Sequence, residues 1–300
     1  MTEEYCSGFI SIIGRPNVGK STLLNRLVGQ KIAIMSDKPQ TTRNKIQGVW
    51  TTDTAQAVFI DTPGIHKPQH KLGEYMVKTA TGALSHMDLI LYVVDVSVPW
   101  GGGEEYIVNM LEKLETPIFF IANKIDQVEP EQLARFLDAV QKRHQFAQWV
   151  PISAATGANM DTLRQLLLER LPPGPKYYPE DMVTDQPERF IIAELIREKT
   201  LQLTREEIPH ALAVVVEEVR QRSEDMVYVA ATIYVERDSQ KGIIIGKKGQ
   251  MLKDIGKLAR EDIQHLLGSQ IYLELWVKVK KAWRRSEVMI RNFGYDSSEE

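Results

Sequence analysis

Short apolar runs alternate with stretches of helical periodicity over the first 171 residues of the chain. The apolar runs predict strands at 9–14, 45–51, 57–61, 89–95, 118–123 and 149–152. Apolar residues spaced three and four apart predict helices at 21–28, 73–85, 104–114, 131–141 and 159–170. Because strands that alternate with helices are joined by crossover connections, we predict an α/β fold with a mostly parallel sheet and helices on both faces.

The pattern changes abruptly after residue 171. Prolines crowd the next stretch, 172–187, at Pro172, Pro173, Pro175, Pro179 and Pro187. Proline disrupts helices and sheets, so we predict a semi-rigid linker between a domain at 1–171 and a second domain at 188–300. In the second domain the pattern predicts an α+β fold, with helices at 190–203, 250–267 and 281–291, strands at 211–222, 226–236 and 271–279, and an acidic tail at 297–300.

Composition adds one feature, an uneven distribution of charge. The whole chain carries a formal charge of −3, yet residues 241–291 hold twelve Lys and Arg against five Asp and Glu. A basic block of this kind predicts a localised surface for a polyanion. The single cysteine, Cys6, excludes an internal disulfide. No run has the length of a membrane span and the first residues lack the basic start of a signal peptide, so we expect a cytoplasmic protein.

Residues 14–21, Gly-Arg-Pro-Asn-Val-Gly-Lys-Ser, lie between the first predicted strand and the first predicted helix. Glycines at both ends let the backbone amides wrap around a polyphosphate, and a helix N-terminus attracts the same charge. Lys20 can reach the β- and γ-phosphates, and the Ser21 hydroxyl can bind Mg²⁺. The predicted nucleotide-binding residues of this loop are Gly14, Asn17, Val18, Gly19, Lys20, Ser21 and Thr22.

Three further motifs follow the ends of later predicted strands. Asp61 can hold Mg²⁺ through water, and the amide of Gly64 can bind a γ-phosphate. In Asn123-Lys124-Ile125-Asp126, the Asp126 carboxylate suits the N1–H and N2–H₂ donors that guanine has and adenine lacks, while Lys124 can cover the base. Losing two such bonds costs enough for roughly thousandfold discrimination. The last motif begins with Ser153 and Ala154, whose amide can donate to guanine O6.

These motifs resemble the GTP-binding domain of Ras-like, translation-factor-related GTPases. The resemblance implies GTP and GDP as ligands with Mg²⁺, and it places a Mg²⁺-binding threonine in the switch segment 39–43, at Thr42 rather than the alternative Thr41. Lys20, Thr42 and Gly64 are then the catalytic residues. Ras-like enzymes orient the attacking water with a glutamine where this chain has Ile65, so we expect slow hydrolysis.

Asn17 has two interpretations of equal weight. GTPases with an apolar residue after the glycine of the third motif include a branch in which this asparagine helps to hold a K⁺ ion over the phosphates. Asparagine also caps loops readily, which requires no ion. Both interpretations remain open from the sequence.

The second domain contains Ile245-Gly246-Lys247-Lys248-Gly249 ahead of a long amphipathic helix and an alternating strand. A bare Gly-x-x-Gly also forms ordinary turns, but this order of elements resembles a type II KH domain, which clamps about four nucleotides of a single strand along the loop. These five residues are therefore the predicted RNA-binding residues. Periodicity alone predicts a strand at 242–245, whereas the KH resemblance implies a short helix. Trp276 and Trp283 lie among basic residues and are either core residues or stacking partners.

Together the two domains and the linker resemble the Era family of GTPases over nearly the whole chain, most specifically at 14–21, 38–43, 61–68 and 273–280. The resemblance implies a GTP-dependent protein that binds the 3′ region of small-subunit rRNA and assists assembly of the small ribosomal subunit. It also implies that some members associate loosely with the cytoplasmic face of the inner membrane. We expect a monomer.

The sequence argues against two other classes of protein. A metabolic or tRNA-modifying enzyme with a GTPase switch needs a second catalytic constellation, and none is apparent after Pro187. A membrane-trafficking GTPase needs a lipidation motif, and neither end of the sequence offers one.

Overall fold

The computed structural model describes residues 4–36, 38, 41–65, 71–84, 86–206 and 208–295. The chain groups into two compact units, one of residues 1–33, 42–67 and 76–185, and one of residues 34–41, 68–75 and 186–300. Part of the predicted switch segment (Pro39 and Gln40), the end of the helix predicted at 73–85 (Ser85), residues 66–68 of the Era-like stretch and the acidic tail lie outside the described residues.

The first unit is built on a sheet with the strand order β2-β3-β1-β4-β5-β6. Only β2 and β3 pair antiparallel, and every other pair is parallel. The strands are β1 (Cys6–Ile13), β2 (Ile46–Thr51), β3 (Ala55–Asp61), β4 (Leu89–Asp95), β5 (Ile118–Asn123) and β6 (Gln148–Ile152). Every residue of β3 and β4 is buried, as expected of strands covered on both faces.

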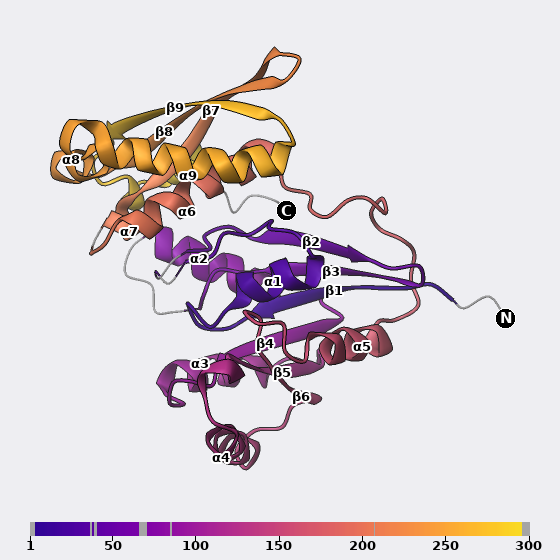
Figure 1. Ribbon diagram of the computed structural model, residues 1–300. Coiled ribbons are helices and arrows are strands. Elements are labelled where there is room, and N and C mark those ends of the chain that lie inside the picture. The colour runs from indigo at the N-terminus through magenta and orange to yellow at the C-terminus, as the bar shows by residue number, and fades with distance from the viewer. Residues whose placement is uncertain are drawn as a thin grey trace. The chain divides into compact units, whose positions relative to one another are not determined.

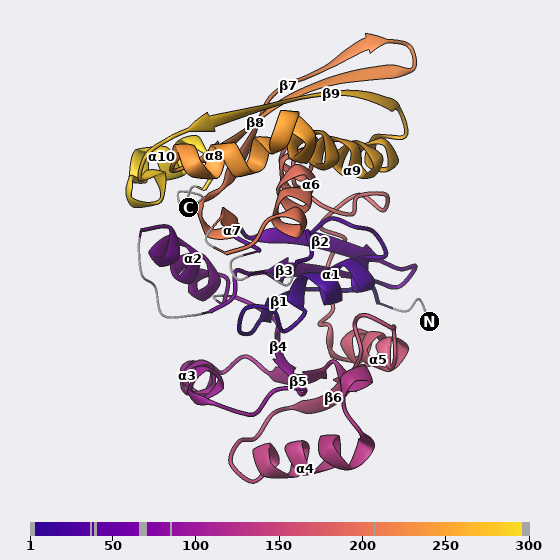
Figure 2. The ribbon, with the colours of Figure 1, turned by 60° about the vertical axis from the view of Figure 1, so that its left-hand side comes forward.

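Helices cover both faces of this sheet. They are α1 (Lys20–Val28), α2 (Lys71–Gly82), α3 (Gly102–Leu111), α4 (Pro130–Gln141) and α5 (Met160–Arg170). The apolar faces of α2, α3 and α4 share one core with β4 and β5, while α1 and α5 lie on the other side of the sheet (Figure 2). The predicted α/β architecture is confirmed, and each predicted element differs from the observed one by only a few residues at its ends.

The proline-rich stretch has the irregular backbone that its composition predicts, but it is not detached from the first unit. The side chain of Gln56 on β3 accepts hydrogen bonds from the amides of Tyr177 and Tyr178, at 2.8 and 2.9 Å, and donates to the Tyr178 carbonyl at 2.9 Å. Farther along, the Val49 amide donates to the Val183 carbonyl at 2.9 Å. The proline-rich stretch up to residue 185 consequently groups with the first unit.

The second unit has a three-stranded sheet in the order β7-β8-β9, in which β7 and β8 are antiparallel and β8 and β9 are parallel. Helices α6 and α9 lie on the same side of this sheet (Figure 1) and enclose its apolar core. The elements are α6 (Glu188–Leu203), α7 (Ile208–Ala211), β7 (Ala213–Ser223), β8 (Met226–Val235), α8 (Asp238–Ile245), α9 (Gln250–Leu267), β9 (Gln270–Val279) and α10 (Glu287–Asn292). Within the described residues, no helix is both long and apolar enough to cross a membrane.

Two predictions for the second unit need correction, and one helix was missed. The strand that periodicity predicts at 242–245 is wrong, because these residues complete helix α8, as the KH resemblance implies. The final helix predicted at 281–291 is instead a 3-10 turn at Trp283–Arg285 followed by α10. Helix α7 was not predicted at all.

The two tryptophans of the basic block have different environments. Trp283 is fully buried and its Nε1 donates to the Ala211 carbonyl at 2.8 Å, so it is a core residue. Trp276 is 55% exposed on β9, and its Nε1 donates to Glu274 at 3.1 Å. Only Trp276 is therefore placed to meet a partner.

Candidate nucleotide site and RNA-binding loop

The phosphate loop joins the end of β1 to the start of α1, as predicted. Its two terminal glycines have positive φ angles, 153° at Gly14 and 100° at Gly19. A Cβ atom would lie 2.3 Å from the Val93 carbonyl oxygen at Gly14, and 2.3 Å from the Asn123 side chain at Gly19. Larger residues are excluded at both positions, because the loop packs directly on the ends of β4 and β5.

Lys20 is the first residue of α1 and is only 5% exposed. Its Nζ donates to the carbonyls of Gly14 and Arg15, at 3.2 and 2.8 Å, so the ammonium group lies within the loop. Burial lowers the pKa of Lys20 to about 8, and the negative charge of Asp61 opposes that shift. A partly desolvated ammonium group in this position is suited to a phosphate anion.

The three residues predicted to bind Mg²⁺ lie together. Ser21 Oγ is 2.8 Å from Thr42 Oγ1 and donates to Asp61 Oδ2 at 2.7 Å. No described residue makes a hydrogen bond to the other carboxylate oxygen, Oδ1 of Asp61, although this atom is buried. Burial raises the pKa of Asp61 to about 6, with Lys20 opposing the shift. Two hydroxyls and an under-coordinated carboxylate are the hard oxygen ligands that Mg²⁺ prefers, so these residues fit the ion.

The predicted base-binding motifs converge on the phosphate loop through Asn123. Its Nδ2 donates to the Val18 carbonyl at 2.8 Å, and its Oδ1 accepts from the Ala154 amide at 3.0 Å. Asn123 therefore ties the loop to the Ser153-Ala154 motif. The buried Ser153 in turn accepts a hydrogen bond from the Thr156 amide at 3.1 Å.

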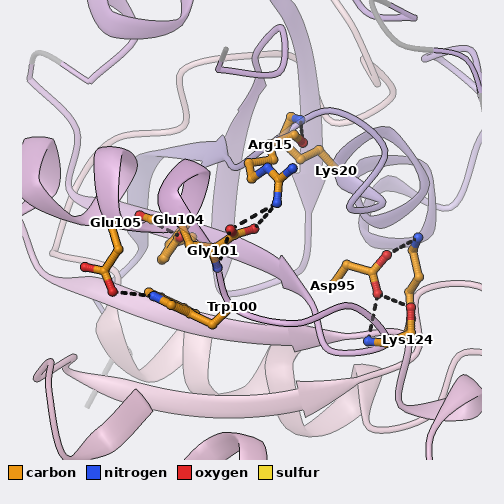
Figure 3. A network of polar contacts seen from close by, with 10 residues as sticks. Arg15, Lys20, Asp95, Trp100, Gly101, Glu104, Glu105 and Lys124 are labelled. Carbon is orange, nitrogen blue, oxygen red and sulfur yellow. Dashed lines mark hydrogen bonds and ion pairs between the residues drawn. The ribbon is translucent and has the colours of Figure 1, made fainter. Parts of the chain in front are cut away.

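Two residues that contact the predicted base-binding motifs, Asp95 and Arg26, were not predicted. Lys124 has a left-handed backbone, with φ of 69°, and its Nζ lies 2.5 Å from Asp95 Oδ2 (Figure 3). Arg26 on α1 donates to the carbonyls of Ala154 and Ala155, at 3.2 and 2.5 Å. Asp95 is the last residue of β4, just as Asp61 and Asn123 are the last residues of β3 and β5. Its position at a strand end could therefore have identified it from the sequence. No local pattern marked Arg26.

Asp126 follows Lys124 in a 3-10 turn and its side chain is exposed. An exposed carboxylate beside the converging motifs can accept hydrogen bonds from a base without a large desolvation cost. Its role in reading guanine stays a prediction.

Ile65 and Asn17 have contrasting environments. Ile65 is 3% exposed in the core that α2, α3 and α4 share, and its amide donates to the Gly14 carbonyl at 3.2 Å. An apolar side chain in the core cannot orient a water molecule. Asn17 is exposed with φ of 66°, a conformation that asparagine tolerates well, so the backbone alone accounts for its presence. A contact with K⁺ stays a prediction.

In the second unit, residues 246–249 form the GKKG loop between α8 and α9. Lys247 and Lys248 are exposed, and Lys248 has a left-handed φ of 51° between two glycines at 73° and 78°. Ile245, directly before the loop, packs against the core of the unit. The loop therefore presents two ammonium groups to solvent, as a nucleic-acid clamp requires.

Comparison with known proteins assigns both units. A family model described as "50S ribosome-binding GTPase" matches residues 9–124, and a KH domain model matches residues 207–284. A crystal structure of Era in complex with MgGDPNP and nucleotides 1506–1542 of 16S ribosomal RNA is 43% identical, covering 97% of this chain and 99% of that chain, with a TM-score of 0.94. A variant of Aquifex aeolicus Era bound to GDP·AlF4⁻ has the same identity and coverage, with a TM-score of 0.93.

The fold and the site thus define a phosphate-loop GTPase unit followed by a KH domain. Identity of 43% over nearly the full length of both chains then specifies the family. The chain belongs to the Era family of GTPases.

Proposed function

We propose that the protein is a GTP-hydrolysing switch that binds the 3′ region of small-subunit rRNA through its KH domain and assists maturation of the small ribosomal subunit. The observation that carries this proposal is full-length similarity to an Era structure that holds both MgGDPNP and 16S rRNA. The assembled Ser21, Thr42 and Asp61 cluster supports the nucleotide half, and the exposed lysines of the GKKG loop support the RNA half.

In the first unit, separate residues bind the phosphates, hold Mg²⁺ and contact the γ-phosphate. Loop amides and Lys20 hold the β- and γ-phosphates, while Ser21, Thr42 and Asp61 are the residues that would hold Mg²⁺. The ion, when bound, neutralises charge that develops on the phosphate oxygens. The Gly64 amide donates to the γ-phosphate, which passes to an attacking water and leaves GDP and inorganic phosphate.

The same residues explain why we expect slow hydrolysis by the protein alone. Lys20, Thr42 and Gly64 stabilise charge, but with Ile65 in the core no side chain at that position guides the water. We propose that bound rRNA or the ribosomal subunit accelerates the reaction, with K⁺ held at Asn17 as a second source of stabilisation.

Single-turnover hydrolysis tests these proposals. The rate should be low in Na⁺ and should rise when an RNA carrying the 3′ region of 16S rRNA is added. Fast turnover in Na⁺ without RNA would contradict the explanation based on Ile65. Equal rates of the wild type in Na⁺ and K⁺, or an undiminished K⁺ effect in Asn17→Ala, would remove the role of Asn17.

The ribosomal partner needs a separate test, because the matching GTPase model is named for the 50S subunit whereas the Era complex contains 16S rRNA. The full-length match covers both units and therefore favours the small subunit. Sedimentation with purified 30S or 50S particles in the presence of a non-hydrolysable GTP analogue separates the two, and co-sedimentation with 50S alone would overturn the proposal.

We also propose that the protein is a cytoplasmic monomer that associates loosely with the inner membrane. Only the family resemblance supports this association. Light scattering after gel filtration measures the mass in solution. Flotation with anionic lipid vesicles measures membrane binding, and failure to float at low salt would contradict it.

A further inference from the structure

The phosphate loop is anchored to helix α3 by the side chain of Arg15, a residue to which the sequence assigned no role. Arg15 reaches from the loop to Glu104, and its Nη1 lies 2.8 Å from Oε1 and 3.0 Å from Oε2 of that carboxylate (Figure 3). Glu104 is buried, with 2% exposed, whereas the Arg15 side chain is 41% exposed, so the carboxylate is withdrawn from water and the guanidinium group partly solvated. The contact joins residues that are 89 positions apart.

Glu104 is itself held in place by the start of α3. Its Oε2 accepts a hydrogen bond from the Gly101 amide at 3.2 Å, and its own amide donates to the Gly101 carbonyl at 3.1 Å. A carboxylate in the first turn of a helix also interacts favourably with the helix dipole. The anion that meets Arg15 is therefore preorganised.

Arg15, which Glu104 holds, is in turn linked to two residues of the proposed catalytic site, Lys20 and Gly64. The Arg15 carbonyl accepts the hydrogen bond from Lys20 Nζ at 2.8 Å. The next residue, Pro16, packs so closely on Gly64 that a Cβ atom at position 64 would lie 2.6 Å from the Pro16 nitrogen. A shift of Arg15 would therefore move the phosphate loop relative to both Lys20 and Gly64.

We propose that Glu104 is a positioning residue for GTP hydrolysis, which acts through Arg15 to set the spacing between the phosphate loop and Gly64. The proposal rests on the proposed function, because it concerns the same nucleotide site. Since Gly64 is the predicted partner of the γ-phosphate, loss of the anchor should affect GTP hydrolysis much more than GDP binding.

Two neighbouring glycines at the start of α3 provide a matched test. A Cβ atom at Gly103 would lie 2.7 Å from Arg15 Nε and 2.9 Å from Arg15 Cδ, whereas a Cβ at Gly102 would meet nothing within 4 Å. Gly103→Ala therefore displaces the arginine without removing either charge, and Gly102→Ala makes the same chemical change one residue away. Because alanine favours a helix over glycine, neither variant should destabilise α3.

The experiment measures RNA-stimulated kcat, GDP affinity and thermal stability for the full-length wild type and both variants. We expect Gly103→Ala to lower kcat by roughly ten- to a hundredfold, the effect of a misplacement of about 1 Å, with GDP affinity and stability close to wild type. Gly102→Ala should behave as wild type in all three measurements. Equal kcat in both variants would overturn the proposal, whereas a wild type that binds no guanine nucleotide would overturn the proposed function itself.

A double-mutant cycle provides the second, independent test. Glu104→Gln retains an oxygen that can accept the Gly101 amide but loses the charge, and Arg15→Met removes the guanidinium group. If Glu104 acts through Arg15, the double variant should have the kcat of the more impaired single variant. If instead the double variant loses kcat by the product of the two single losses, Glu104 acts independently of Arg15 and the proposal is overturned.

Discussion

Lys20 in the phosphate loop and Lys247 in the GKKG loop both lie beside glycines and are both predicted to contact phosphate, yet their surroundings are opposite. Lys20 is 5% exposed and donates to two backbone carbonyls, and burial lowers its pKa to about 8. The Lys247 side chain is exposed at the surface of the second unit. The first lysine belongs to a preorganised site, and the second is a solvated charge.

This difference implies two modes of recognition. Buried, preorganised groups contribute strongly because the protein has already desolvated and oriented them, so a single substitution can abolish function. Exposed ammonium groups act through counterion release, so each contributes little and its contribution declines with salt. The nucleotide site should therefore respond to geometry and pH, and the RNA loop to ionic strength.

The largest effect should come from Asp126, the predicted base-reading residue of the first unit. Asp126→Asn replaces one acceptor with an amide donor, which no longer suits guanine but can bond the C2 oxygen of xanthine. We expect preference for GTP over XTP to fall by about a thousandfold, because one charge-assisted hydrogen bond to guanine is lost and a new hydrogen bond to xanthine is gained. Competition binding with labelled GDP measures the preference.

Because Asp126 is exposed, the folded state should tolerate this change, and thermal unfolding of the variant provides the control. A well-folded variant that keeps the wild-type preference for GTP would show that another residue reads the base.

A smaller effect, on stability, should distinguish the buried site from the exposed loop by pH. The pKa of Asp61 is raised from 3.8 to about 6, so between these values the folded state binds more protons than the unfolded state. The free energy of unfolding contributed by this group therefore falls as pH rises from about 4 to about 6. We expect Asp61→Asn to gain on the order of 1–3 kcal/mol of stability relative to wild type across this window.

Denaturant unfolding of the nucleotide-free protein at pH 4.5 and pH 7 measures the difference between wild type and variant, which cancels the other carboxylates. Lys248→Gln is the matched control in the exposed loop and should show no pH-dependent difference from wild type. A constant difference between Asp61→Asn and wild type at both pH values would contradict the burial argument.

The sequence predicted the elements and motifs that depend on local pattern. Because parallel strands end at one edge of a sheet, motifs that follow strands β1, β3, β5 and β6 had to converge, and the structure brings their residues together. Contacts between distant residues had no such signal. The pairs Arg15–Glu104 and Asp95–Lys124 each join charges from separate elements, and only the fold places them side by side.

The error at 242–245 has a different cause. Three consecutive isoleucines favour a strand by propensity, but Gln240 accepts hydrogen bonds from the amides of Glu236 and Arg237, at 3.0 and 3.1 Å, and so starts a helix. Of the three isoleucines only Ile244 is fully buried, while Ile243 is half exposed. Capping and tertiary packing therefore outweighed strand propensity.

The smallest effect per substituted residue should be on RNA affinity, for substitutions in the GKKG loop. Replacing Lys247 and Lys248 with aspartate keeps both flanking glycines, and because the two side chains are exposed, folding should change little. If both lysines contact phosphate as predicted, two attractions become two repulsions. On single-stranded RNA each neutralised phosphate contributes about −0.7 to the slope of log affinity against log salt, so the slope should flatten by roughly 1.4.

Fluorescence anisotropy with a labelled single-stranded 16S 3′-end RNA, titrated at several salt concentrations, measures this slope, and GDP binding by the same variant provides the control. GDP affinity should stay at the wild-type value, because the lysines belong to the second unit and the nucleotide residues to the first. An unchanged slope and RNA affinity in a folded variant would mean that residues 246–249 form an ordinary turn. The excess of positive charge at 241–291 would then have to act through other residues, such as Lys278 and Lys280 beside the exposed Trp276.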